Sequence, residues 1–337
     1  MVDKASSGEL LSVRDSTNPS RRAFFSALLG ATGLIASGCA TTDSFASAIA
    51  GPTTSVRGFQ IPPTASDRTE LVALYSPSRV IAANQPGQRV PFGVVESGEK
   101  TLQDGSSLPI IIRKDGETIS ELTVVGHVAA HDHVGQVAGD GHQHADISRY
   151  YPLRVDFPTA GVYDIETRVN GEFLSLPVQA FERDEVQGTL PGQPFPSVQT
   201  PTDADSAGVD RVCTRFEHCG LHNVSVDQIL GTQAFVLLVA TPAFCATAFC
   251  GPVIETVLGI TNEFEGVQFI HGEVYSNTDE VNGNFSDPNI EIAQYLRDLG
   301  LDFEPVLYVV NANGVLVERL DNIFDATELR AAVSSVI

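Results

Sequence analysis

Four of the five cysteines form two close pairs that could carry redox chemistry. Cys213 and Cys219 enclose five residues, and Cys245 and Cys250 enclose four. Two neighbouring thiols either close a structural disulfide or exchange disulfides with another protein. Both pairs lie beyond residue 212, and residues 40–212 contain no cysteine. This asymmetry predicts a chain of two unlike halves, with the thiol chemistry in the second.

The spacing of Cys245 and Cys250 restricts how they can lie. Residues five apart in one helix are separated by about 7.5 Å along its axis, whereas a disulfide needs Cα atoms within about 4.4–6.8 Å. Pro252 is tolerated in a first helical turn but not in a helix interior. We therefore expect the helix to start at or next to Cys250, with Cys245 in the preceding loop. A helix N-terminus favours a thiolate, so Cys250 is predicted to be the more activated thiol. The alternative is a structural disulfide between the two.

The pair Cys213 and Cys219 lies in a segment without strong periodicity. We predict a structural disulfide that fixes an irregular loop. The alternative is a second dithiol that exchanges with Cys245 and Cys250. His218 and His222 stand close enough in the sequence to join a metal site there, although two surface histidines alone do not indicate one.

Five of the eight histidines fall within eighteen residues and include two His-x-His pairs. On a strand, residues i and i+2 share a face, so each pair could ligate one ion, and imidazole suits copper, zinc and nickel. The candidate metal ligands are His127, His131, His133, His142 and His144. The alternative is chance clustering in a polar loop. His271 lies in the middle of a predicted strand and is expected to be a buried histidine with its hydrogen bonds satisfied.

The elements that must position these residues divide the chain. Residues 67–185 carry short strand-like runs and no helical stretch, with Asp-Gly and Asn-Gly turns after Lys114 and Val169. This pattern predicts an all-β sandwich of immunoglobulin-like kind. Residues 186–224 are rich in proline and glycine and are predicted to be a linker, which includes Cys213 and Cys219.

The spacing of apolar residues along the sequence changes after residue 225. Residues 234–240 are a continuous apolar run, as in a strand buried on both faces, and strands are also predicted over 267–275, 306–310 and 315–320. Helices are predicted over 251–258, from Asp287 to Gly300, and from Asp325 onward with Glu328 completing a capping box. The sequence thus predicts an α/β domain over residues 225–337.

This order resembles the thioredoxin fold. Two cysteines follow the first buried strand, and Phe249-Cys250-Gly251-Pro252 is similar to the family's Trp-Cys-Gly-Pro segment. Glu304-Pro305 stands where the family keeps a cis-proline that faces the cysteines. The chain departs from thioredoxins in having four residues between the cysteines instead of two. The resemblance implies thiol–disulfide chemistry at Cys245, Cys250 and Pro305.

A closer resemblance is to exported thioredoxin-like lipoproteins whose function is not established. Segments such as Cys213-Thr214-Arg215 and Phe269-Ile270-His271 carry it. The start of the chain agrees, because Ser20-Arg21-Arg22 has a twin-arginine form and is followed by an apolar run too short to span a membrane. We predict a signal peptide over residues 1–38, a lipid anchor on Cys39 and a tether over residues 39–66. The alternative is cleavage after Ala48, which releases a soluble protein.

The charge balance restricts the partners. Acidic residues number 42 and basic residues 20, a formal net charge of -22, so nucleic acid is not an expected partner. The sequence predicts an exported protein held on the outer face of the cytoplasmic membrane, with protein thiols or disulfides outside the membrane as partners. We expect thiol–disulfide exchange without a definite cofactor. The alternatives are a copper- or zinc-binding envelope protein and a non-catalytic module with structural disulfides.

Overall fold

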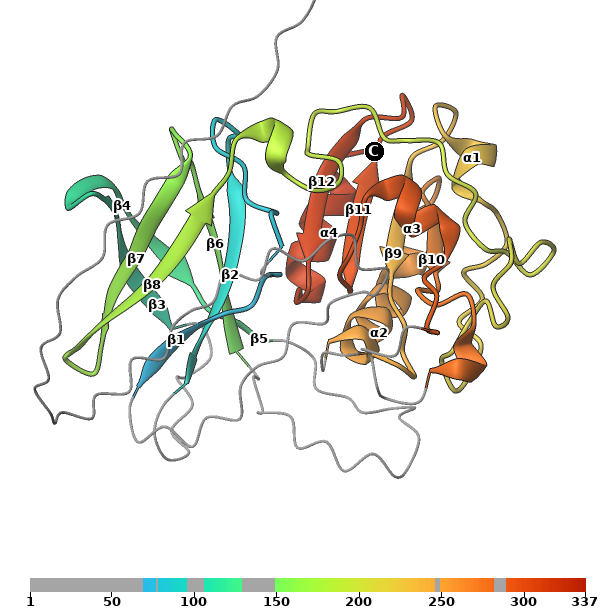
Figure 1. The fold of residues 1–337 in the computed structure, drawn as a ribbon, viewed down its shortest axis with the longest axis horizontal. Helices are drawn as coiled ribbons and strands as arrows, with labels where there is room; N and C mark the ends of the chain where they lie inside the picture. Colours follow the sequence, from blue (N-terminus) through green and yellow to red (C-terminus); the bar gives the residue numbers. More distant parts are fainter. Residues whose placement is uncertain (1–68, 77, 96–105, 129–148, 246–248, 282–288) are drawn as a thin grey trace, which may run out of the picture. The chain divides into compact units, whose positions relative to one another are not determined.

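The computed structural model describes residues 69–76, 78–95, 106–128, 149–245, 249–281 and 289–337. These residues are mostly β-structure, arranged as three four-stranded sheets with a few short helices (Figure 1). They belong to one compact unit, residues 51–337. The predicted signal peptide, the anchor Cys39 and the tether lie outside the described residues, and the predicted domain boundaries stay predictions. In the described part of the chain, no helix has the length and apolar character needed to cross a membrane.

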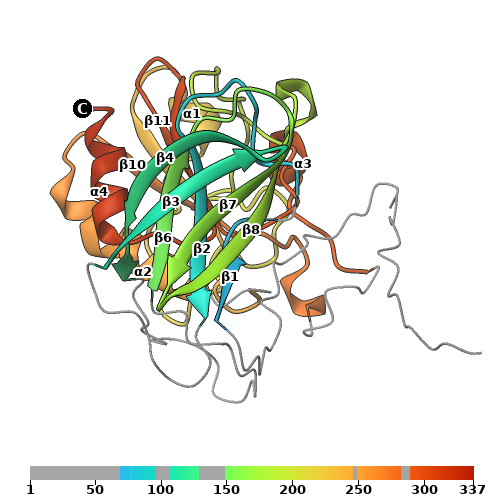
Figure 2. The same ribbon diagram turned by 90° about the vertical axis from the view of Figure 1, so that its left-hand side faces the viewer.

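Two of the sheets are antiparallel and contain no α-helix between their described strands. The first has the order β1-β2-β6-β5, with β1 Glu70–Ala73, β2 Gln88–Val95, β5 His127–Val128 and β6 Arg149–Val155. The second has the order β4-β3-β7-β8 and faces the viewer in Figure 2. Its strands are β3 Ser107–Lys114, β4 Glu117–Val125, β7 Gly161–Val169 and β8 Glu172–Ala180.

Alternating apolar residues give these two sheets a common core. Val90 and Phe92 of β2 and Ile110 and Ile112 of β3 are all buried in one hydrophobic cluster, as a period of two residues requires. The predicted turns are confirmed at Asp115-Gly116 and Asn170-Gly171, where both residues of each pair have positive φ, the conformation of a type I′ hairpin.

The third sheet is mixed and lies after residue 225. Its order is β10-β9-β11-β12, in which β9 and β10 are parallel and the other pairs antiparallel. The strands are β9 Phe235–Val239, β10 Gln268–Gly272, β11 Val306–Val310 and β12 Leu316–Asp321. All residues of β9 and β11 are buried, because apolar side chains cover both faces of the sheet.

Helices cover the two faces of this mixed sheet. Val236 and Leu238 of β9 pack with apolar residues of α2 (Cys250–Ile260) and α4 (Ala326–Ser334), whose ribbons are orange and red in Figure 1. The opposite face packs with residues of α1 (Val226–Ile229) and α3 (Gln294–Leu299). Short 3₁₀ helices are η1 Arg183–Glu185, η2 Thr261–Glu263 and η3 Thr278–Glu280.

The observed helix ends agree in part with those predicted from the sequence. Gly300 ends α3 in the left-handed conformation, with φ 64°, and the Asp325 side chain accepts the Glu328 N–H at 2.9 Å to begin α4. However, α3 begins at Gln294 rather than near Asp287, and residues 282–288 are not described. The Glu328 carboxylate does not complete a capping box either, because it binds Arg89 instead.

The predicted linker lies against the mixed sheet. Gly192 donates its N–H to the Leu316 carbonyl at 2.7 Å, and Leu316 donates to Gln193 at 2.9 Å. Phe195 is buried with Phe235 and Tyr308 against the sheet face. This segment, which is irregular as predicted, is thereby fixed along β12.

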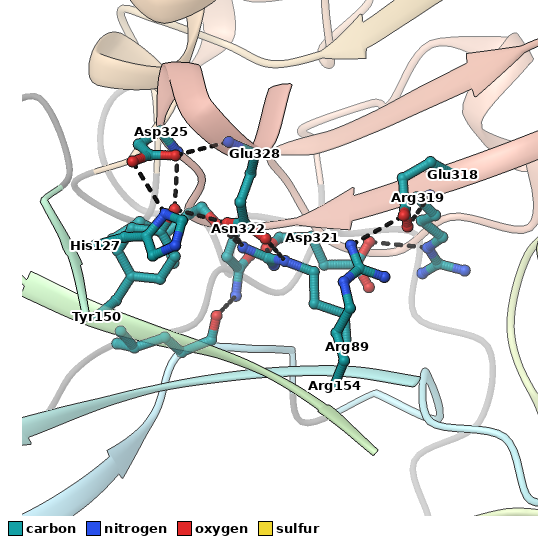
Figure 3. Close-up of polar contacts among 12 residues, drawn as sticks. Arg89, His127, Tyr150, Arg154, Glu318, Arg319, Asp321, Asn322, Asp325 and Glu328 are labelled. Carbon is teal, nitrogen blue, oxygen red and sulfur yellow. Dashed lines mark hydrogen bonds and ion pairs between the residues drawn. The ribbon is translucent and has the colours of Figure 1, made fainter. Parts of the chain in front are cut away.

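A largely buried polar network connects the β1-β2-β6-β5 sheet to the start of α4 (Figure 3). The Arg89 guanidinium of β2 donates to both carboxylate oxygens of Glu328, at 2.9 and 2.7 Å. The Tyr150 hydroxyl donates to the same carboxylate at 2.6 Å and accepts the Asp325 N–H at 2.8 Å. His127 completes the set through Asp325, with Nδ1 and Oδ2 3.0 Å apart. We call these five residues the Arg89 network.

Candidate functional site

Cys245, Cys250 and Glu304 meet at the start of α2. One ligand atom of each, the two sulfurs and a carboxylate oxygen, lies within 4.8 Å of the others. Helix α2 begins at Cys250, as predicted from Pro252, and Cys245 lies in the loop that follows β9. Residues 246–248 between them are not described. We call these three residues the dithiol site.

The two thiols of the dithiol site differ in exposure. Cys250 is fully buried, whereas Cys245 is half-buried. The backbone N–H of Cys250 donates to the Cys245 sulfur at 3.3 Å. The N-terminal N–H of the helix therefore stabilises negative charge on Cys245, not on Cys250.

This arrangement contradicts the predicted direction of the Cys250 pKa shift. Burial raises the pKa of Cys250 well above its ordinary value, and the neighbouring Cys245 and Glu304 raise it further. The prediction that Cys250 has a lowered pKa is wrong, because the helix start lies inside the core, where a thiolate loses its hydration. Position along the helix alone did not carry that information.

Glu304 and Pro305 come from the segment that leads into β11. The Glu304–Pro305 peptide bond is cis, as predicted. The Glu304 side chain is fully buried beside the two sulfurs. Because a carboxylate oxygen lies within 4.8 Å of both sulfurs, this carboxyl is a candidate for taking up and giving back a proton at the thiols.

The residue before Cys250 connects the dithiol site to the antiparallel sheets. Phe249 is buried with Leu74, Tyr150 and Ile323 in a small hydrophobic cluster. Tyr150 in turn belongs to the Arg89 network. Asn322 bridges the same region, donating its backbone N–H to the Pro305 carbonyl and its side-chain amide to the Leu74 carbonyl.

A second group of four donor side chains lies next to the loop over residues 240–245. Its members are the two other cysteines and two histidines: Cys213, Cys219, His222 and His271. Their ligand atoms all lie within 4.8 Å of one another. His222 and His271 are fully buried, and the cysteines are half-buried. We call this set the four-ligand cluster.

Backbone pairing at the edge of the mixed sheet forms this cluster. His271 lies in β10, an edge strand, and its N–H donates to the Leu221 carbonyl at 2.9 Å. The chain from Cys219 to His222 therefore runs beside β10, which places both residues next to His271. The Cys219 sulfur is 3.2 Å from His222 Nε2 and 3.4 Å from His271 Nδ1, and these two nitrogens are 3.2 Å apart.

The two cysteines of the cluster shift each other's pKa in opposite directions. The hydrogen bond from the Cys219 thiol lowers the pKa of the Cys213 thiol, and the two histidines lower it further. The same hydrogen bond and burial raise the pKa of Cys219. All four described cysteines are thiols in the structure, so the predicted Cys213–Cys219 disulfide and the Cys245–Cys250 disulfide stay predictions.

Further contacts tie the four-ligand cluster to the loop that leads to Cys245. His271 Nε2 is 2.9 Å from the Ala240 carbonyl. Thr214, next to Cys213, accepts the Ala243 N–H at 3.3 Å and donates its hydroxyl to the buried Glu273 carboxylate at 2.7 Å. The cluster and the neighbouring Thr214 thus hold the backbone of the loop that carries Cys245.

The predicted metal ligands of the histidine-rich segment are not brought together within the described residues. His131, His133, His142 and His144 lie outside them. His127 is described, and its Nδ1 faces Asp325. The group His127, Asp325 and Glu328 has metal-ligand spacing, but Glu328 already binds the Arg89 guanidinium, whose positive charge opposes a metal ion there.

Sequence reasoning missed the positions of His271 and Glu304, and it considered His222 only together with His218, as a candidate member of a metal site near Cys213 and Cys219. His271 is fully buried with a hydrogen-bond partner at each ring nitrogen, as predicted, but the sequence did not indicate that the partner of Nδ1 is a cysteine. The available signal was the pair of cysteines three and nine residues before His222. Nothing in the sequence places that segment beside β10. Comparison of the chain with protein families, curated proteins and solved structures gave no match.

Proposed function

We propose that the chain is an exported thioredoxin-like protein that exchanges disulfides with protein thiols outside the cytoplasmic membrane. The observation that carries this proposal is the asymmetry of the dithiol site. A half-buried Cys245 receives the N–H of Cys250, and a fully buried Cys250 lies beside Glu304. An attacking thiol must be reachable and ionised, whereas a resolving thiol must be protected until the attack has happened.

Features around the site support a thioredoxin-like α/β domain over residues 225–337. The parallel strands β9 and β10 flank α2 in the chain, β11 and β12 extend the sheet, and a cis-proline precedes β11. We propose that the two antiparallel sheets with their common core form the immunoglobulin-like sandwich. The predicted lipid anchor at Cys39 would hold both at the outer face of the membrane.

The first step is attack by Cys245. Its thiolate forms a bond to one sulfur of a partner disulfide, whose other sulfur leaves as a thiolate and takes a proton from water. The product is a mixed disulfide between Cys245 and the partner. Because the Cys250 N–H points at the attacking sulfur, it stabilises the thiolate that starts this step.

The second step closes the internal disulfide. Cys250 loses its proton to Glu304 and attacks the Cys245 sulfur, so that a Cys245–Cys250 bond forms and the bond to the partner breaks. The departing partner thiolate receives a proton, which Glu304 can return. The partner gains two electrons and the dithiol site loses two. A second extracytoplasmic dithiol reverses the steps and restores the site.

Single cysteine variants test this assignment. Cys250→Ser should trap a mixed disulfide on Cys245, whereas Cys245→Ser should abolish exchange and trap nothing. In the reduced wild type, Cys245 should be alkylated on the order of a hundredfold faster than Cys250, because Cys250 reacts only after local opening. Mass spectrometry of the trapped and alkylated peptides measures both.

The other cysteine pair supplies the control. Cys213→Ser should leave the mixed disulfide at Cys245 in place. A partner trapped in Cys245→Ser instead of Cys250→Ser would reverse the roles. A wild-type chain without exchange activity, with a Cys245–Cys250 potential below about -300 mV, would indicate a structural disulfide and overturn the proposal.

A further inference from the structure

We propose that Cys213, Cys219, His222 and His271 bind one zinc(II) ion, which holds the segment around Cys213 and Cys219 to the edge strand β10. This site is separate from the dithiol site and does not depend on its chemistry. Its ligands come from an irregular segment and from a strand 49 residues beyond His222. Four side chains of the two residue types that zinc prefers converge there within the described residues.

The distances between donor atoms fit a tetrahedron. Zinc bonds of about 2.3 Å to sulfur and about 2.0–2.1 Å to nitrogen give tetrahedral edges of about 3.3 Å between nitrogens and about 3.5 Å between sulfur and nitrogen. The two histidine nitrogens are 3.2 Å apart, and the Cys219 sulfur lies 3.2 and 3.4 Å from them. These three donors therefore need only small shifts to bind one ion, and the Cys213 sulfur lies within 4.8 Å of each of them.

Contacts behind the ligands orient them as in a zinc site. The Ala240 carbonyl lies 2.9 Å from His271 Nε2. An N–H at Nε2 would donate to this carbonyl and leave the lone pair of Nδ1 directed at the cluster, which is the usual arrangement behind a ligating histidine. The segment of Cys213 is fixed as well, because Thr214 donates both its N–H and its hydroxyl to Glu273.

Charge and donor type select the metal. Two thiolates balance the charge of one divalent ion, so the buried centre becomes neutral, whereas two thiolates alone would be costly to bury. Four protein ligands leave no open position, which is the pattern of a structural zinc site rather than a catalytic one. Magnesium and calcium require oxygen ligands, and the cluster offers none.

The ion would fix a segment that the local backbone holds only weakly. Between Cys213 and His222 the structure has no helix or strand, and one N–H from His271 to Leu221 joins this stretch to β10. A bound zinc adds a cross-link between the two. It also uses both thiolates, so zinc binding and the predicted Cys213–Cys219 disulfide exclude each other.

Zinc titration of the full chain tests the proposal. The reduced, metal-free chain is titrated with Zn²⁺ against a chromophoric chelator, in a background where His131, His133, His142 and His144 are changed to Asn. We expect one zinc per chain. Each of Cys213→Ser, Cys219→Ser and His271→Gln should weaken binding by more than about a hundredfold, since even changes behind a ligand cost about 10- to 100-fold.

The chain offers matched controls. His218→Gln alters an exposed histidine four residues before His222 that pairs with Asp203, and it should leave the zinc affinity unchanged. Cys245→Ser with Cys250→Ser should leave it unchanged as well, which separates a failure here from a failure of the exchange function.

If the ligand variants fail to fold, a measurement on the unaltered chain still tests the proposal. X-ray absorption of the zinc-loaded wild type should give two sulfur ligands at about 2.3 Å and two nitrogen ligands at about 2.0 Å. Cobalt(II) in place of zinc should show thiolate charge-transfer bands. A first shell without sulfur, zinc retained in the Cys213→Ser, Cys219→Ser double variant, or binding of copper(I) without zinc would overturn the proposal.

Discussion

The dithiol site and the four-ligand cluster both contact the loop over residues 240–245, but they surround their sulfurs differently. At the dithiol site one thiol is half-buried, the other is fully buried, and the buried polar neighbour is an acid, Glu304. In the four-ligand cluster both cysteines are half-buried and the buried neighbours are two histidines. A carboxylate next to a buried thiol can accept its proton, whereas neutral imidazole nitrogens beside two thiols form a donor set that suits one zinc ion. The difference separates a pair suited to exchange from a pair suited to ligation.

Among the variants that test this comparison, Glu328→Gln should have the largest effect, a fall in the free energy of unfolding. The change leaves the Arg89 guanidinium, of which 4% of the side chain is exposed, without its carboxylate. Removing one partner of a buried ion pair costs about 3–5 kcal/mol in the free energy of unfolding, measurable by urea denaturation. Phe249 packs against Tyr150, a partner of Glu328, so alkylation of Cys250 should also accelerate, while zinc affinity should not change.

The control for this variant lies in the same helix. Arg330→Gln removes an exposed pair with Glu263 and should lower the free energy of unfolding much less than Glu328→Gln does, because solvent screens an exposed ion pair. Equal losses in the two variants would mean that the Arg89 network contributes no more than a surface ion pair. A large fall in zinc affinity with Glu328→Gln would show that the two sites are not independent.

The next largest effect should come from Glu304→Gln. If the carboxylate accepts the Cys250 proton, its loss should slow closure of the internal disulfide by about a hundredfold, the lower end of general-base contributions, and leave attack by Cys245 unchanged. Rapid-quench single turnovers separate the two steps. If Glu304 acts only by its charge, which raises the pKa of Cys250, the amide would lower that pKa and closure would become faster.

The smallest predicted effect is the pH dependence of the stability that His127 contributes. The hydrogen bond to Asp325, with the charge of Asp325 and Glu328, raises the pKa of His127 above 6.5 although burial opposes it. The folded chain therefore holds this proton more tightly than the unfolded chain. This stability is fully present below pH 6.5 and is lost as pH rises through the folded pKa.

Because His127 is only partly buried, we expect the change to stay below about 1 kcal/mol. Urea midpoints between pH 6 and 9 should fall in the wild type and be flatter in His127→Gln. An equal slope in both would assign the titration to another group. Zinc binding, whose thiolates form more readily at higher pH, should strengthen over the same range. The stability that His127 contributes and the zinc affinity of the four-ligand cluster should therefore respond to pH in opposite directions.

Much of the local structure could be predicted from the sequence. The start of α2 followed from Pro252, the two hairpins from Asp115-Gly116 and Asn170-Gly171, and the fully buried strands β9 and β11 from continuous apolar runs. These features depend on residues close together in the chain. Turn chemistry and burial on both faces leave clear local patterns.

The composition of the sites could not be predicted in the same way. His271 joins Cys213 and Cys219 because an irregular segment pairs with the edge of β10, and such pairing leaves no periodic pattern. The order of reactivity at Cys245 and Cys250 depends on which sulfur is buried, and this is decided by tertiary packing. Glu304 was noted only as the residue before Pro305, since nothing local shows that its side chain is buried.

The pairing of Arg89 with Glu328 has a consequence for the synthesis of the chain. The two residues are separated by 239 positions, and a growing chain is made from its N-terminus. Strand β2 is therefore complete long before α4 exists, and until then Arg89 must keep its charge in water, because burying it alone is costly. An unfinished chain cannot bury this surface. A chain in which α4 has not yet been made therefore leaves Arg89 without the carboxylate that its burial requires.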